Sequence, residues 1–386
     1  MNFHKKPEIR PKRAEFSSGP CPKRPGWDLK KIVSLAWLGR SHRAPGPKTQ
    51  INQLIKMTSD LLNIPSDYKV GVVPASNTGA FEMAMWTMLG ERAVDMLVWE
   101  SFGATWATDA IEQLKLPDCR VLIAEYGKLP DLNQVRDNSD ICFTLNGTTS
   151  GTRVPDLRFV NRKREGLTFC DATSAMFAQD IDWSKLDATT FSWQKSMGSE
   201  GAHGMIILSP RAILRLESYK PDRPIPKIFR LTENSKIIHD IFSGSTINTP
   251  SMLCIADAID SLLWIKEIGG VPETIKRSNR NFSILQGWID QQDWIENLVK
   301  SPSARSNTSV CLRIIKPDFL SLTVKAKRKF INQMTQLLES EGVAYDIGGH
   351  RDAPPSLRIW CGPTVNSEDL EDLLPWLKWA FHVVCK

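Results

Sequence analysis

The chain has 386 residues, which is enough for two or three domain-sized units. Hydrophobic residues make up 41% and charged residues 24%, the proportions of an ordinary soluble globular protein. Lysine and arginine exceed aspartate and glutamate by 49 − 43 = 6, a modest excess that favours small anions at least as much as nucleic acid. Apolar runs of membrane-spanning length are absent, as is the apolar core of a signal peptide, so we expect a cytoplasmic protein with no membrane partner.

Dense positive charge occurs only near the N-terminus, in the stretch His4–Arg13. A nucleic-acid binder usually arranges its basic residues as a stripe with interleaved aromatic residues, and this stretch has no such arrangement. We therefore predict a solvated basic tail within an extended N-terminal segment, residues 1–30, and no nucleic-acid partner.

The eight cysteines are scattered, and none forms a Cys-x-x-Cys pair. Several lie inside apolar runs that are typical of strands. The pattern indicates reduced, mostly buried thiols and no metal site.

From residue 70 onward, short apolar runs alternate with helical patterns. The predicted strands are 70–73, 96–99, 120–124, 141–145, 167–171, 189–193 and 204–208. The predicted helices are 49–62, 80–89, 106–115, 210–218 and 251–267, with 32–38 a short helix or strand. Such alternation predicts an α/β fold with a mostly parallel sheet of about seven strands, covered by helices on both faces.

The region after residue 270 has a mixed composition that predicts a smaller α+β domain. Its predicted helices are 272–290, 318–341 and 367–382, and its predicted strands are 309–315, 343–347 and 357–361. We place the large domain at 31–255 and the small C-terminal domain at 256–386.

Two of the predicted strands deliver a charged residue to their carboxyl ends. Asp171 ends one apolar run, and Lys195 lies in the polar turn after another. Ligands of open α/β sheets bind at this edge. An amine and a carboxylate suit pyridoxal phosphate, which needs a Schiff-base partner and a group that keeps its ring nitrogen protonated. A structural ion pair or two unrelated surface charges is the alternative for these two residues taken alone.

The loop 74–79 joins a predicted strand to a predicted helix through small polar residues. A helix N-terminus after such a loop offers free backbone N–H groups and a positive dipole end to a phosphate. The alternative is that Ser76 simply caps the helix.

Taken together, six short motifs resemble those of the phosphoserine aminotransferase family, a group of fold-type I, class V enzymes that use pyridoxal phosphate. The motifs are Phe16-Ser-Ser-Gly-Pro20, Ser41-His-Arg43, Asp171-Ala-Thr-Ser174, Trp193-Gln-Lys195, Ile247-Asn-Thr-Pro250, and Gly349-His-Arg351 with Arg358. The resemblance runs over nearly the whole chain, and is strongest to members with an extended basic N-terminal segment.

The resemblance implies how the cofactor is held. Lys195 matches the Schiff-base lysine and general base, and Asp171 matches the partner of the pyridine nitrogen. Trp106 matches the aromatic residue that stacks on the ring, and Thr148 matches a hydroxyl near the phenolic oxygen, with Thr149 as the alternative. A core tryptophan and a turn-capping threonine are the structural alternatives for these positions.

The resemblance also assigns the cofactor's phosphate. The matching residues are Ser76, Asn77 and Gln194, together with Asn248 and Thr249, which the family donates from a neighbouring subunit. Many members are glycine-rich at 76–78, and this chain has Ser-Asn-Thr instead. Side-chain and backbone contacts to the phosphate both remain open, and Asn248–Thr249 could also be a simple helix cap.

On the substrate side, four residues match the family's cluster for a substrate phosphate: His42, Arg43, His350 and Arg351. Arg358 matches the clamp for the α-carboxylate. The structural alternative for each arginine is a solvated surface residue. The implied enzyme is a homodimer with a shared active site.

The implied reaction moves the amino group of L-glutamate to 3-phosphohydroxypyruvate, giving O-phospho-L-serine and 2-oxoglutarate. The phosphorylated hydroxythreonine analogue of the pyridoxine route is a second implied substrate.

Two other functions are compatible with part of the pattern. One is another class V enzyme, such as an alanine–glyoxylate type aminotransferase or a cysteine desulfurase. A desulfurase needs a nucleophilic cysteine in a mobile loop, and the loop 348–356 has none, while Cys361 lies beyond it in a predicted strand. The other is a non-catalytic binding protein that kept the fold, against which the intact Lys195 and Asp171 argue.

Overall fold

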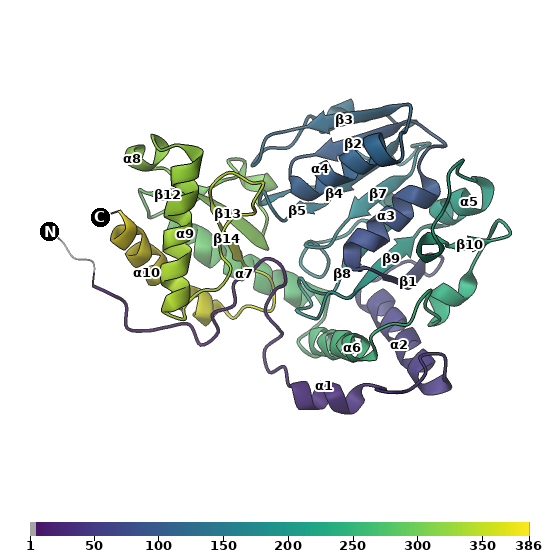
Figure 1. Cartoon of the computed structure of the whole chain (residues 1–386), viewed down its shortest axis with the longest axis horizontal. Helices are drawn as coiled ribbons and strands as arrows, with labels where there is room; N and C mark the ends of the chain where they lie inside the picture. The colour runs from purple at the N-terminus through teal and green to yellow at the C-terminus, as the bar shows by residue number, and fades with distance from the viewer. Residues whose placement is uncertain (1–4, 386) are drawn as a thin grey trace.

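A computed structural model describes residues 5–385, and its largest element is a seven-stranded sheet (Figure 1). In spatial order the strands are β1 (Lys69–Pro74), β9 (His203–Leu208), β8 (Ala188–Ser192), β7 (Thr168–Asp171), β4 (Asp140–Thr144), β2 (Val94–Val98) and β3 (Cys119–Ile123). Only β9 runs antiparallel to its neighbours, β1 and β8. The remaining neighbours pair in parallel, which confirms the predicted mostly parallel sheet.

Helices cover both faces of this sheet, as predicted (Figure 1). One face carries α3 (Ser76–Met88), α4 (Ser101–Thr108) and α5 (Pro210–Ser218), and the other carries α2 (Pro45–Leu61) and α6 (Met252–Glu267). In β2, the side chains of Met96 and Val98 pack on the face covered by α3, α4 and α5, while that of Leu97 packs on the face covered by α2 and α6. Successive strand side chains point to opposite faces, so a strand buried on both faces is apolar along its whole length.

A second apolar core lies in the C-terminal region, around an antiparallel sheet of β12 (Ile295–Asn297), β13 (Ser309–Ile314) and β14 (Leu357–Trp360). Its helices are α7 (Val271–Ile289), α8 (Pro317–Leu320), α9 (Val324–Ser340) and α10 (Ser367–Val384). The smaller α+β unit is therefore confirmed as a fold. Helix α6 packs in the large core and α7 in the second one, so we propose a domain boundary in the α6–α7 connection, and the division at 255/256 stays a prediction.

The short elements complete the description. They are α1 (Leu29–Leu35), the hairpins β5 (Asn146–Gly147) with β6 (Thr152–Arg153) and β10 (Thr232–Glu233) with β11 (Lys236–Ile237), a π-helical turn at Asp109–Gln113, and 3-10 turns at Leu132–Gln134, Trp183–Lys185, Lys227–Phe229, His239–Ser243 and Pro302–Ala304. Within residues 5–385, we find no helix both long and apolar enough to cross a bilayer.

Two predictions in the small domain are wrong. The predicted helix 318–341 is interrupted, because the Thr323 hydroxyl caps the new helix α9 by accepting from the Ala326 N–H at 3.3 Å. The predicted strand 343–347 is not a regular strand, since Asp346 has a φ of 54°. Val343 and Ile347 are fully buried, so their apolar character reflects core packing instead of a strand ladder. The short strand β12 was not predicted.

The N-terminal segment is largely solvated, as predicted, but it is not a free tail, because residues 5–16 lie along the small domain and residues 21–24 contact the large one (Figure 1). The backbone carbonyl of Phe16 accepts from the Trp360 N–H at 3.0 Å, and the carbonyl of Ile9 accepts from the Trp376 indole at 2.6 Å. Lys6 and Arg10 both pair with Glu341. Much of the basic charge is thus used within the protein, while His4 lies outside the described residues.

Candidate active site

Lys195 lies in the turn between β8 and β9, with only 8% of its surface exposed. Its Nζ donates a hydrogen bond to the carbonyl oxygen of Ser18 in the N-terminal segment. Burial lowers the pKa of the Lys195 amine, and nearby Arg358 lowers it further, while Asp171 acts in the opposite direction. A buried amine with a lowered pKa is more available as a nucleophile and as a base.

Asp171 ends strand β7, which pairs in parallel with β8, so Asp171 and Lys195 lie at the same edge of the sheet. One carboxylate oxygen accepts from the backbone N–H of Thr173 at 3.0 Å and from its hydroxyl at 2.7 Å. Burial raises the pKa of Asp171, while Thr173, Trp106 and Lys195 lower it. These partners stabilise a carboxylate inside the protein.

Trp106 lies in α4 and is buried against Phe81, with ring centroids 4.9 Å apart. Its indole Nε1 makes no well-formed hydrogen bond within the described part of the chain, although the side chain is near enough to Asp171 to influence that carboxyl. A flat aromatic ring beside the buried carboxylate is a suitable wall for a planar heterocycle.

Thr148 and Thr149 lie in the turn of the β5–β6 hairpin, and their hydroxyls point to different partners. The Thr149 hydroxyl donates to Glu100 at 2.8 Å and accepts from the Ser101 N–H at 3.0 Å. The Thr148 hydroxyl donates to Ser174 at 2.8 Å. Thr149 uses its hydroxyl both as donor and as acceptor at the start of α4, whereas the Thr148 hydroxyl only donates to Ser174 and can still accept, so Thr148 is the better candidate for a ligand contact.

The start of α3 has the geometry expected of a phosphate site. Ala75 and Ser76 adopt left-handed backbone conformations, with φ of 64° and 54°. The N-cap residue of α3 is Ala75, and no side chain caps this end of the helix. The alternative in which Ser76 caps the helix is therefore wrong. The first backbone N–H groups of a helix lack intrahelical partners, and a phosphate can accept from them.

Several buried polar groups around this edge lack a hydrogen-bond partner among the described residues. They include the side-chain carbonyl oxygens of Asn77 and Gln194 and the indole nitrogen of Trp106. An amide side chain can present either its oxygen or its NH2 group. Unsatisfied buried polar groups are costly unless a ligand pairs with them, so the residues present fit a planar, phosphate-bearing cofactor.

On the small domain, Arg358 and His350 approach the lysine. Arg358 projects from β14, is half-buried, and its Nε has no hydrogen-bond partner in residues 5–385. Burial lowers the pKa of His350, and the charges of Arg358 and Lys195 lower it too. Arg351 is exposed, and its Nε lies 3.8 Å from Asp352. The two arginines are cationic and His350 can donate from its ring N–H, so together they can receive an anionic substrate beside Lys195.

The single chain does not bring the other four predicted residues to this group. His42 and Arg43 lie in the connection between α1 and α2, on the side of the molecule away from the small domain (Figure 1). Asn248 and Thr249 are exposed near β9, where the following Ser251 N–H donates to His203 at 3.0 Å. No contact joins these four residues to Lys195 within the described chain.

Sequence reasoning missed Glu100 and Ser18. Glu100 caps α4 by accepting from the Gly103 N–H at 2.7 Å, and burial raises its pKa to about 7. It lies two residues after the end of β2, so the rule that identified Asp171 at a strand end would also have found it. Ser18 lies inside the motif Phe16-Ser-Ser-Gly-Pro20, but the motif assigned it no role, since its carbonyl reaches Lys195 only through the fold.

Comparison with known proteins gives the family. No protein-family model matches the chain. The phosphoserine aminotransferase of Methanosarcina mazei is 52% identical over 379 residues, which cover 98% of this chain and 100% of that protein. The enzyme of Methanosarcina barkeri is 51% identical over the same length. The chain belongs to the phosphoserine aminotransferase family.

Solved structures confirm the fold-type I architecture. The phosphoserine aminotransferase of Bacillus circulans aligns with a TM-score of 0.79 at 18% identity, covering 96% of this chain and 99% of that one. The pyridoxal-phosphate-bound enzyme of Trichomonas vaginalis aligns with a TM-score of 0.73 at 19% identity, covering 95% and 100%. An alanine–glyoxylate aminotransferase from Nostoc aligns with a TM-score of 0.78 at 16% identity, covering 97% of each chain, so the fold alone does not separate these activities.

Proposed function

We propose that the protein is a phosphoserine aminotransferase, which transfers the amino group between L-glutamate and 3-phosphohydroxypyruvate. The observation that carries this proposal is 52% identity over the full length of a phosphoserine aminotransferase, in a chain whose Lys195 and Asp171 lie buried at one sheet edge. O-phospho-L-serine and 2-oxoglutarate are the products.

Pyridoxal phosphate, when bound, supplies an electron sink for the carbanion formed at the substrate Cα. Lys195 provides the amine that holds the cofactor and afterwards accepts and returns the Cα proton. Asp171 would present its carboxylate to the ring nitrogen, and Thr173 keeps that carboxylate oriented. Trp106 and Thr148 would border the ring, and the start of α3 with Asn77 and Gln194 would receive the phosphate.

Substrate selection falls to the basic residues. Arg358 binds the α-carboxylate that both amino acids share, and His350 with Arg351 receives the phosphate of phosphoserine. His42, Arg43, Asn248 and Thr249 lie away from Lys195 in one chain. We infer that a second copy supplies them, which makes the enzyme a homodimer with shared active sites.

The alternative functions account for fewer of the residues in the candidate site. An alanine–glyoxylate type enzyme shares the fold but needs no cluster for a substrate phosphate. A desulfurase would need a reactive thiol, whereas Cys361 is fully buried and burial raises its pKa well above the ordinary value. A non-catalytic binding protein would not need a buried Lys195 with a lowered pKa.

All eight cysteines are free, which supports the proposed cytoplasmic location.

A spectral titration of the purified holoenzyme tests this proposal. L-phosphoserine and L-glutamate should each convert the visible absorption band of the bound cofactor to that of its amino form, and L-alanine should not. Conversion by L-alanine as efficient as by L-phosphoserine would leave the cofactor chemistry intact and reject the substrate. A protein that stays colourless after addition of the cofactor would reject the role of Lys195.

A further inference from the structure

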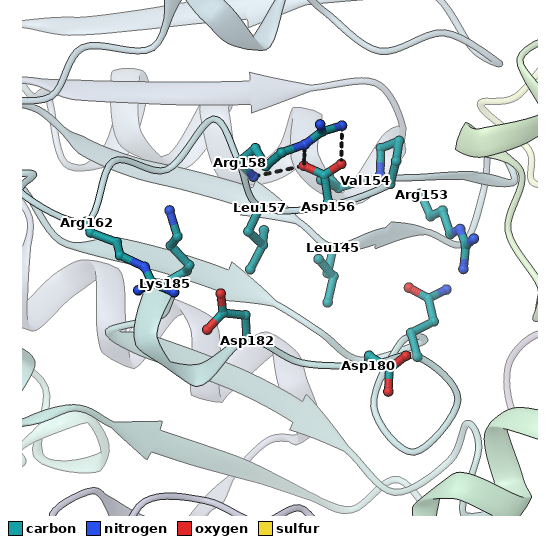
Figure 2. Close-up of a pocket in the computed structure, with 12 residues that line it drawn as sticks. Leu145, Arg153, Val154, Asp156, Leu157, Arg158, Arg162, Asp180, Asp182 and Lys185 are labelled. Carbon is teal, nitrogen blue, oxygen red and sulfur yellow. Dashed lines mark hydrogen bonds and ion pairs between the residues drawn. The ribbon is translucent and has the colours of Figure 1, made fainter.

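A polar cavity of about 580 Å³ lies beside the β5–β6 hairpin (Figure 2). Arg153 and Asp180 lie at one end of it, and Arg162, Lys185 and Asp182 lie at the other. Gln179 also lines the cavity. The apolar side chains of Leu145, Val154 and Leu157 lie between the two ends. None of these residues belongs to the site around Lys195.

Several of the charged groups in this cavity are already engaged. Arg158 pairs with Asp156 at 2.8 Å, as the dashed lines in Figure 2 show. Lys185 donates to the carbonyl of Val160, and Asp182 accepts from the Ser184 N–H at 3.1 Å. These contacts neutralise or hold their charges without a ligand.

Arg153 and the exposed Asp180 have no such partner among residues 5–385. Arg153 is half-buried, its Nε is inaccessible to solvent, and no hydrogen bond or ion pair to its side chain is found in residues 5–385. Burial lowers the pKa of Arg153 and the charge of Asp180 opposes this, yet the two do not approach within ion-pair distance. A buried guanidinium N–H without a partner is unfavourable, so the cavity is suited to a ligand that gives Nε of Arg153 a partner.

We propose that this cavity is a second ligand site, for a small zwitterionic α-amino acid. The ligand's carboxylate binds the guanidinium of Arg153, which is suited to a forked contact, and its ammonium binds the carboxylate of Asp180. A simple anion would satisfy Arg153 but would meet the negative charge of Asp180. The apolar wall at Val154 and Leu157 receives the side chain of the amino acid.

This site is connected to the catalytic edge by short contacts. Arg153 is paired in register with Asn146 across the hairpin whose turn carries Thr148. The Gln179 side-chain amide donates to Oδ1 of Asn146 at 3.0 Å, and the Asn146 side-chain amide donates to the Ser174 hydroxyl at 2.8 Å. Thr148 donates to the same Ser174 hydroxyl at 2.8 Å. A ligand held by Arg153 therefore acts on the hairpin that positions Thr148, which makes it an effector of the proposed transamination.

The binding test uses 2-aminoisobutyrate, a zwitterion that has no α-hydrogen and cannot be transaminated. Binding to the holoenzyme is measured by calorimetry and by saturation-transfer NMR. Arg153→Gln should weaken binding by about tenfold or more, the effect of one lost charge-assisted contact. Arg158→Gln is the matched control in the same cavity, because Arg158 already pairs with Asp156, and it should leave binding unchanged.

A second variant tests the zwitterion. Asp180→Asn should weaken 2-aminoisobutyrate and strengthen isobutyrate, which has the carboxylate alone. If isobutyrate binds the wild-type protein as tightly as the zwitterion does, the cavity is an anion site and the proposal is wrong. If Arg358→Gln abolishes binding while Arg153→Gln does not, the probe binds the active site and the proposal is again wrong.

The connection to catalysis is tested in the same proteins. Saturating 2-aminoisobutyrate should change kcat in the wild-type and Arg158→Gln enzymes and leave Arg153→Gln unaffected. An unchanged kcat in the wild-type protein despite binding at Arg153 would reject the effector role. Should Arg153→Gln fail to fold, Arg153→Lys keeps the charge but loses the forked donors, and must show reduced binding for the proposal to stand.

Discussion

At the residue scale, Lys195 combines burial with a single local partner. Its Nζ bonds the carbonyl of Ser18, and the charges of Arg358 and Asp171 act on it in opposite directions. The fold therefore holds an amine at the sheet edge without committing it to an ion pair. This is the condition that a Schiff-base lysine requires.

Lys195→Ala should reduce transamination by at least about 10³-fold, because both the covalent attachment and the general base are lost. Circular dichroism of the variant should match that of the wild-type protein, since the substitution removes one hydrogen bond to a carbonyl oxygen. Steady-state rates measure the effect. Activity within tenfold of wild type would contradict the assigned role.

Arg351→Ala should raise the KM for L-phosphoserine by about tenfold or more and leave that for L-glutamate nearly unchanged, because only phosphoserine carries the group that Arg351 is proposed to bind. Half-reaction titrations with each amino acid separate the two effects. Lys300→Ala is a control, since Lys300 pairs with Glu296 away from the site and should alter neither. An equal loss for both substrates would reject the phosphate assignment.

Glu100 gives a pH prediction. Burial raises its pKa from an ordinary 4.5 to about 7, and Asp171 adds to the shift. Between these values the folded protein keeps a proton that the unfolded chain releases, so the free energy of unfolding falls as the pH rises through this window. Well above pH 7 both the folded and the unfolded protein have released this proton, so Glu100 no longer makes the free energy of unfolding depend on pH.

Glu100→Gln should therefore gain stability relative to the wild-type protein as the pH rises from about 4.5 to about 8, by roughly 1–3 kcal/mol. The glutamine oxygen can still accept from the Gly103 N–H, so the cap of α4 is kept. Urea unfolding of both proteins at the two pH values measures the difference. A constant difference across the range would show that Glu100 stays ionised in the folded protein.

At the element scale, the phosphate site depends on how closely α3 approaches β9. A Cβ added at Gly204 would lie 2.2 Å from the backbone oxygen of Ser76 and 2.8 Å from the Ala80 side chain. The Ser76 oxygen belongs to the backbone and cannot rotate away as a side chain could, so the first turn of α3 would have to move. Gly204 is needed because the helix start must lie directly against the strand.

Gly204→Ala should destabilise the protein by about 1–3 kcal/mol and weaken cofactor retention, because overpacking shifts the proposed phosphate contacts. Gly287→Ala is the matched control, since a Cβ there meets nothing within 4 Å on α7. That change should stabilise the helix by about 0.5–1 kcal/mol. Denaturant unfolding and dialysis against buffer without cofactor measure both, and a Gly204→Ala protein as stable as wild type would contradict the tight approach.

At the scale of the whole molecule, the large core and the small domain supply different residues of the candidate site. The large core holds Lys195, Asp171 and Trp106, and the small domain contributes His350 and Arg358. The N-terminal segment joins them, since Phe16 packs in the second core and Cys21 bonds the carbonyl of Gln194 at 2.8 Å. We propose that a second copy completes this arrangement by supplying His42 and Arg43.

The shared site predicts complementation between two inactive variants. Lys195→Ala and Arg43→Ala subunits, mixed in equal amounts after denaturation and refolding, should recover about one quarter of the wild-type activity with phosphoserine. Half of the dimers would be mixed, and each mixed dimer would contain one site with neither change. Each variant refolded alone is the control. A mixture no more active than the sum of these controls would place Arg43 in the same site as its own Lys195.

The sequence by itself determined the alternating strands and helices, and it determined that Asp171 and Lys195 meet. Strand alternation is local, and parallel strands bring their carboxyl ends to one edge whatever else the chain does. The apolar strands of the large sheet were predictable for the same reason, because burial on both faces leaves a continuous apolar run.

Only the tertiary structure decided the features that depend on distant partners. The basic N-terminal segment has the composition of a tail, but Glu341, Trp360 and Trp376 give it hydrogen bonds and ion pairs from more than 300 residues away. The segment 343–347 has the apolar pattern of a strand, yet core packing satisfies it without a ladder. The separation of His42 and Arg43 from Lys195 likewise follows from where α2 packs, because a local motif carries no information about the distance to another motif.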